Sequence, residues 1–125
     1  MTTLPGRLYV VSTPIGNLAD FSPRAVETLG AASLVLAEDT RHSRHLLDQY
    51  EIATPLAPYH EHNEARETPR LVERMLAGES MALISDAGTP LVSDPGARLV
   101  RAAIDAGIEV IAIPGASALL AALVS

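Results

Sequence analysis

Short runs of apolar, often β-branched residues alternate along the chain with stretches in which apolar residues recur every three or four positions. The short runs predict strands at 7–11, 34–36, near 56, at 81–84 and at 108–113. The other stretches predict helices at 22–30, 40–50, 68–77, 94–106 and 117–124. Strands that alternate with helices predict an α/β fold, a five-stranded parallel sheet with helices on both faces.

Prolines and glycines predict where these helices begin and end. A capping residue precedes a proline at the expected first helical position in Ser22-Pro23, Thr68-Pro69 and Asp94-Pro95. Glycines at 30, 78 and 107 are expected to end helices. Four others, Gly16, Gly88, Gly96 and Gly115, follow the expected carboxyl ends of strands. Ligands bind at that edge of open α/β sheets, so we expect the functional site there.

Length and composition are those of one globular domain. The chain has 125 residues, of which 48% are hydrophobic and 19% are charged. No apolar run reaches the roughly 18 residues that a membrane span needs, and the first residues do not resemble a secretion signal, so a cytoplasmic protein is expected. With no cysteine, disulfides, thiolate zinc sites and a cysteine nucleophile are excluded within these residues.

The charge balance restricts how the domain could bind nucleic acid. The net charge is −6 and all nine basic residues are arginine. A domain with this net negative charge is poorly suited to bind the RNA backbone over its whole surface. An RNA substrate would have to meet a local basic patch or another part of the protein. One Phe and three Tyr leave no aromatic platform for stacking bases.

Three loops after strands are candidates for small-molecule binding. Residues 85–96, SDAGTPLVSDPG, combine acids, hydroxyls and glycines after a buried strand, although a turn and a helix cap would explain 94–96. Residues 12–17, STPIGN, match neither the dinucleotide fingerprint nor a lysine-containing phosphate loop, and are a polar turn or part of a site. Small residues at 114–118 suit close approach of a flat ligand or tight strand-to-helix packing.

Two further segments carry chemistry-bearing side chains. Glu38 and Asp39 precede a helix on which Arg41, Arg44 and His45 share one face. In one interpretation the acids cap the helix and the basic side chains are solvated. In the other, an acid deprotonates a hydroxyl and the neighbouring arginines bind phosphate. In 59–64, YHEHNE, the His-x-His spacing alone is a weak metal signal, and a substrate-facing or ordinary surface loop remains open.

Together, the segments TPIGN, AEDTR, YHEHNE, SDAGTPLVSDPG and IPGASA resemble, in order and approximate spacing, the bacterial small-subunit ribosomal RNA 2′-O-methyltransferase I family. This family belongs to the tetrapyrrole-methylase-like class. The resemblance covers the chain from Leu8 to Val124. It implies the N-terminal domain of a two-domain fold that binds S-adenosylmethionine between its domains and forms a homodimer, with the C-terminal domain absent from this chain.

The resemblance also implies roles for particular residues. It assigns the cofactor to Pro14, Asp86, Ala87, Gly88, Thr89, Pro90, Ser117 and Ala118. It assigns the substrate, a cytidine ribose in 16S ribosomal RNA of the small subunit, to Thr13, Asn17, Thr40, Arg41, Arg44, His60, His62 and Asn63. Glu38 is the expected catalytic base, Asp39 is the near alternative, and no metal is required.

Several alternatives stay open from the sequence. The same fold could methylate a tetrapyrrole carbon or a modified protein histidine, although TPIGN replaces the glycine-richer first loop of tetrapyrrole enzymes. A nicotinamide-binding domain is suggested by the position of Glu38 after Gly16, but the glycine fingerprint is missing. Outside enzymes, the chain could be a dimerisation or ribosome-binding module without chemistry.

Overall fold

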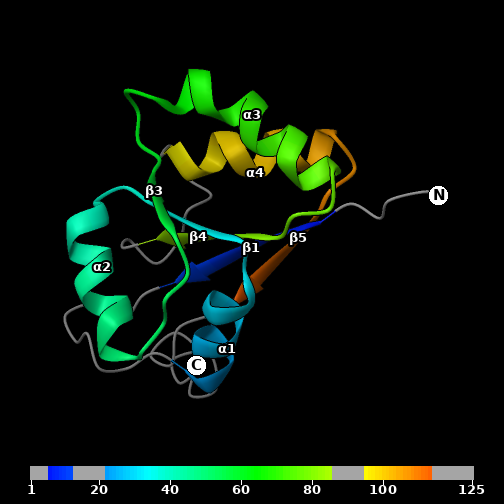
Figure 1. The fold of residues 1–125 in the computed structure, drawn as a ribbon. Helices are drawn as coiled ribbons and strands as arrows, with labels where there is room; N and C mark the ends of the chain where they lie inside the picture. Colours follow the sequence, from blue (N-terminus) through cyan, green and yellow to red (C-terminus); the bar gives the residue numbers. More distant parts are fainter. Residues whose placement is uncertain (1–5, 13–21, 86–94, 114–125) are drawn as a thin grey trace, which may run out of the picture.

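A five-stranded parallel sheet lies between two pairs of helices in the computed structural model, which describes residues 6–12, 22–85 and 95–113 (Figure 1). The strand order is β3-β2-β4-β1-β5, and every pairing is parallel. The elements in chain order are β1 (Arg7–Ser12), α1 (Pro23–Ala31), β2 (Leu34–Ala37), α2 (Thr40–Gln49), β3 (Leu56–Pro58), α3 (Glu64–Leu76), β4 (Met81–Ser85), α4 (Pro95–Asp105) and β5 (Glu109–Ile113). The predicted fold class is confirmed.

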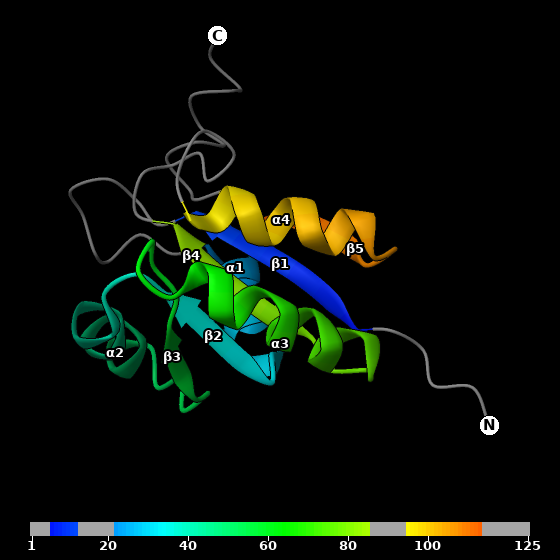
Figure 2. The same cartoon turned by 90° about the horizontal axis from the view of Figure 1, so that it is seen from above.

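Alternating side chains on the strands build a separate hydrophobic core on each face of the sheet. On β1, Leu8 and Val10 join the core under α3 and α4, while Val11 joins the core under α1 and α2. The same alternation divides Leu36 from Val35 on β2. Figures 1 and 2 show the two helix pairs on opposite sides of the sheet. Both faces are therefore covered, as buried parallel strands require.

Most helix boundaries agree with the capping signals in the sequence. Ser22 caps α1, accepting a hydrogen bond at its Oγ from Ala25 N at 3.1 Å, and Pro23 is the first helical residue. Pro95 likewise begins α4. Gly78 and Gly107 follow helices with positive φ angles of 111° and 82°, but Gly30 lies within α1 and does not end it.

The predicted start of α3 is wrong. The helix begins at Glu64 rather than after Thr68, so Thr68 and Pro69 lie inside it. Thr68 donates a hydrogen bond from Oγ1 to the Glu64 carbonyl at 2.6 Å instead of capping. Pro69 leaves one backbone hydrogen bond unmade in the second turn, and the helix continues because Leu71 and Met75 are buried against the sheet.

Residues 13–21, 86–94 and 114–125 lie outside the described part of the chain. This leaves the predicted helix at 117–124, the Asp94 cap and three of the four edge glycines without a structural description. The fourth, Gly96, is a buried residue in the first turn of α4. Within the described segments, no helix is both long and apolar enough to cross a membrane.

Candidate functional site

The carboxyl ends of the strands lie side by side at one edge of the sheet. Ser12, the last residue of β1, pairs with Ser85, the last of β4, and Val11 pairs with Ile113 at the end of β5. The connection after β1 leads to α1 on one face, whereas that after β4 leads to α4 on the opposite face. Neighbouring strands whose connections diverge in this way mark the usual ligand site of an open α/β sheet.

The residues expected to bind cofactor fall in the segments that leave this edge. Pro14, Asp86, Ala87, Gly88, Thr89, Pro90, Ser117 and Ala118, together with Thr13 and Asn17 of the expected substrate set, lie outside the described residues. Their side-chain positions remain predictions. The three strands that precede these segments are adjacent and end together, which brings the starts of all three segments to one place.

Glu38 and Asp39 follow β2 at the same edge but have different surroundings. Asp39 is the N-cap of α2, and its Oδ1 accepts a hydrogen bond from His42 N at 3.1 Å. Glu38 is exposed, and no hydrogen bond or ion pair joins its carboxylate to another residue of the described segments. Of the two acids, Glu38 is therefore the one whose carboxylate has no hydrogen-bond partner within the described segments.

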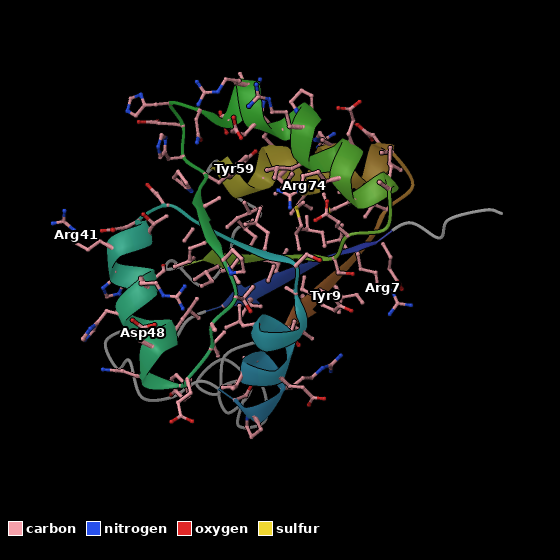
Figure 3. The ribbon with its side chains drawn as sticks, viewed as in Figure 1. Arg7, Tyr9, Arg41, Asp48, Tyr59 and Arg74 are labelled. Carbon is pink, nitrogen blue, oxygen red and sulfur yellow. The ribbon has the colours of Figure 1, made fainter. Side chains whose placement is uncertain are left out.

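Arg41 and Arg44, which were expected to share a basic face on α2, have different surroundings in the structure. Arg41 is exposed near the start of the helix and points away from the sheet (Figure 3). Arg44 instead turns toward the loop before β3, donating hydrogen bonds to the carbonyls of Thr54, at 3.0 Å, and Ile52. Its Nε also lies 3.0 Å from Asp48 Oδ1. Within the part of the chain that the structure describes, Arg41 has no ion pair or side-chain hydrogen bond, whereas the guanidinium of Arg44 holds a loop. Thr40, the first residue of α2, is half-buried.

The loop between β3 and α3 is held by the side chain of Asn63. This residue is only 8% exposed; its Oδ1 accepts from His60 N at 2.8 Å and its Nδ2 donates to the Pro58 carbonyl at 2.9 Å. Both polar atoms of the Asn63 carboxamide are therefore hydrogen-bonded within the loop, which leaves this side chain little capacity to bind a substrate. The side chains of Glu61 and His62 are exposed on this loop, and that of His60 is half-buried.

The two histidines pack against each other. Their ring centroids lie 5.7 Å apart and the rings are inclined at 65°, an edge-to-face arrangement. The His62 side chain is 83% exposed, whereas Nδ1 of His60 is buried and has no hydrogen-bond partner among the described residues. No group of three or more His, Asp or Glu side chains in the described segments is arranged to hold a metal ion.

Behind this loop, Tyr59 connects the end of β3 to α3. Tyr59, labelled in Figure 3, is 1% exposed. Its hydroxyl lies 2.6 Å from Thr68 Oγ1. Because the single hydroxyl proton of Thr68 is directed to the Glu64 carbonyl, the Tyr59 hydroxyl is the donor to Thr68. Burial raises the pKa of the Tyr59 hydroxyl, which keeps it protonated. Sequence reasoning missed this pair because it read Thr68 as a cap.

Removing the acceptor of this pair should cost more stability than removing the donor. Tyr59→Phe leaves Thr68 bonded to Glu64, so we expect a loss of about 1 kcal/mol in the free energy of unfolding. Thr68→Val leaves the Tyr59 hydroxyl buried without an acceptor, and we expect a loss of about 2 kcal/mol or more. Urea unfolding of both variants measures the difference, and the reverse order would contradict the assigned proton direction.

Parallel strands with paired helices on each face, and divergent connections at the carboxyl edge, define an open α/β domain, the class of fold in which ligands usually bind at that edge. The chain belongs to the tetrapyrrole (corrin/porphyrin) methylase family, which it matches over residues 7–125.

Among individual relatives, the chain is 57% identical to the ribosomal RNA small subunit methyltransferase I of Synechocystis sp. over 96% of its own length. It is 59% identical to the protein of the same name from Mesorhizobium japonicum over 98% of its length. In both cases the match covers 43% of the relative, so the chain spans less than half the length of these curated relatives.

Solved structures with lower sequence identity share the fold. A uroporphyrin-III C-methyltransferase of Thermus thermophilus, complexed with S-adenyl homocysteine, matches 94% of the chain and 48% of its own chain, with a TM-score of 0.65 and 22% identity. Diphthine synthase matches 89% of the chain and 45% of its own, with a TM-score of 0.69 and 19% identity. At these identities the likeness concerns the fold alone.

Proposed function

We propose that the chain is the N-terminal domain of an S-adenosylmethionine-dependent methyltransferase that methylates the ribose 2′-hydroxyl of a cytidine in 16S ribosomal RNA. The observation that carries this proposal is the 57–59% identity, over nearly the whole chain, to proteins named for methylation of small-subunit ribosomal RNA. The partner is then the small ribosomal subunit, in the cytoplasm, and the active protein is a homodimer whose second domain completes the cofactor site.

The residues at the carboxyl edge fit S-adenosylmethionine in chemistry. The adjacent ends of β1, β4 and β5 lead into segments with an acid, hydroxyls and small residues, which suit a ligand with an amino-acid part, a ribose and a flat base. Asp86 to Pro90, with Pro14, Ser117 and Ala118, would hold it. When bound, the cofactor supplies a methyl group made electrophilic by a sulfonium.

The described residues supply the acceptor side of the reaction. Glu38 accepts the proton of the ribose hydroxyl, since its carboxylate is exposed at the end of β2 and has no partner in the described segments. Arg41, the second residue of α2, binds a neighbouring phosphate. Asp39 holds the start of α2, and Arg44 holds its connection to β3, so both keep Glu38 and Arg41 in place.

Transfer of a labelled methyl group tests the function. We expect the full-length protein to label small ribosomal subunits or their RNA from labelled S-adenosylmethionine, with loss of label when the acceptor nucleotide carries a 2′-O-methyl group. Asp86→Ala should abolish calorimetric binding of S-adenosylmethionine while leaving the fold intact. No binding by the full-length protein would refute the methyltransferase assignment. Label on an added tetrapyrrole instead of RNA would favour the other acceptor class on this fold.

A further inference from the structure

We propose that the His60–His62 pair is a stacking surface for a nucleotide base of the RNA acceptor, with His62 as the stacking side chain and Asn63 as its positioning residue. This inference rests on the proposed function. RNA-binding proteins commonly stack bases on aromatic side chains, and this chain has few Phe and Tyr and no Trp. The inference gives this role to the histidine pair.

The position of the loop places this surface beside the proposed acceptor site. Tyr59 N donates a hydrogen bond to the Ala37 carbonyl at 2.9 Å, which holds the ends of β2 and β3 together. Glu38 is the next residue after Ala37, and His60 is the next after Tyr59. The segments that follow β2 and β3 therefore leave the sheet side by side. The first carries Glu38, the proposed catalytic base, and the second carries the histidine pair.

The geometry of the pair suits stacking. His62 is 83% exposed, so a face of its ring is open, while the edge-to-face contact with His60 supports the ring. Because Asn63 fixes the backbone of His60 from both ends of the loop, less conformational entropy is lost when a base binds.

Neighbouring charge favours a base over a phosphate at this position. The carboxylate of Glu61 lies 3.8 Å from Nε2 of His62, and its side chain is 77% exposed. Glu38 and Asp39 add negative charge at the end of the adjacent strand. An anionic phosphate would be repelled by these carboxylates, whereas the uncharged face of a nucleobase would not.

Steady-state methyl transfer by the full-length protein to small ribosomal subunits tests the stacking role of His62. We expect His62→Ala to raise KM for the subunit by about tenfold, with kcat and the Kd for S-adenosylmethionine nearly unchanged. His62→Phe should restore KM to within about threefold of wild type, because it keeps a flat ring. Gln49→Ala, an exposed polar position at the far end of α2, serves as the control and should leave KM unchanged.

Asn63→Ala separates positioning from a general structural role. We expect it to raise KM for the subunit in the wild-type background but to add nothing in the His62→Ala background, because both changes remove the same contact. An unchanged KM in His62→Ala, failure of His62→Phe to restore it, or additive effects of the two changes would each overturn the inference. A wild-type protein without methyl transfer would instead overturn the proposed function.

Discussion

Replacing Gly6 by alanine is expected to lower the free energy of unfolding by about 3 kcal/mol. A Cβ at this position would lie 1.8 Å from the carbonyl oxygen and 2.3 Å from the carbonyl carbon of Glu79. Both atoms belong to the backbone of the turn between α3 and β4, so no side-chain rotation can relieve the overlap. The chain must move away, and doing so breaks the 2.6 Å hydrogen bond from Gly6 N to the Met75 carbonyl.

Thermal unfolding measures this effect, with Gly30→Ala as a matched control. Gly30 is exposed within α1, and a Cβ there would meet nothing within 4 Å, so the same substitution should stabilise the helix by about 0.5–1 kcal/mol. We expect Tm to fall by roughly 10 °C for Gly6→Ala and to rise slightly for Gly30→Ala. An unchanged Tm for Gly6→Ala would contradict the close packing of Gly6 against the backbone of Glu79.

Gly6 also shows which constraints a single sequence does not reveal. The glycines at 78 and 107 follow helical patterns, so their role could be predicted from neighbouring residues, and their positive φ angles confirm it. The requirement at Gly6 comes from a segment more than seventy residues away, where Arg7 N also donates to Ser80 Oγ at 3.2 Å. Nothing in the residues around Gly6 indicates that contact.

The fold was predictable because local and tertiary preferences agree over most of the chain. The strands are short apolar runs that become buried on both faces, and the proline-led starts of α1 and α4 are where the sequence places them. At α3 the two preferences disagree. Thr68-Pro69 has the form of a helix start, but burial of Tyr59 and the hydrogen bonds of Asn63 favour a helix that begins one turn earlier.

The edge of the sheet where the candidate residues lie was predictable, but the surroundings of their side chains were predictable only in part. The edge of the sheet follows from the order of strands and helices, and Glu38, Arg41 and His60 all lie there. The local pattern groups Arg44 with Arg41 on one helical face, yet Arg44 donates to two loop carbonyls, eight and ten residues further along the chain. A guanidinium serves phosphates and carbonyls equally well, so only the tertiary structure distinguishes the two uses.

Replacing Glu38 by glutamine is expected to lower kcat for methyl transfer by about 10²–10⁴-fold. Glutamine has nearly the same shape but cannot accept the proton of the ribose hydroxyl. The side chain is exposed and unpaired in the described segments, so the substitution should leave the fold and the Kd for S-adenosylmethionine nearly unchanged. Single-turnover methyl transfer by the full-length protein at saturating cofactor measures the chemical step directly.

Asp39→Asn distinguishes the two acids at the end of β2. Asparagine caps helices about as well as aspartate, so the hydrogen bond from His42 N to the side chain and the start of α2 should be kept. If Glu38 is the base, Asp39→Asn retains most of the turnover. A severe loss in Asp39→Asn with full activity in Glu38→Gln would transfer the role to Asp39. Full activity in both variants would mean that neither carboxylate takes the proton, and that transfer depends on alignment of the hydroxyl with the methyl group alone.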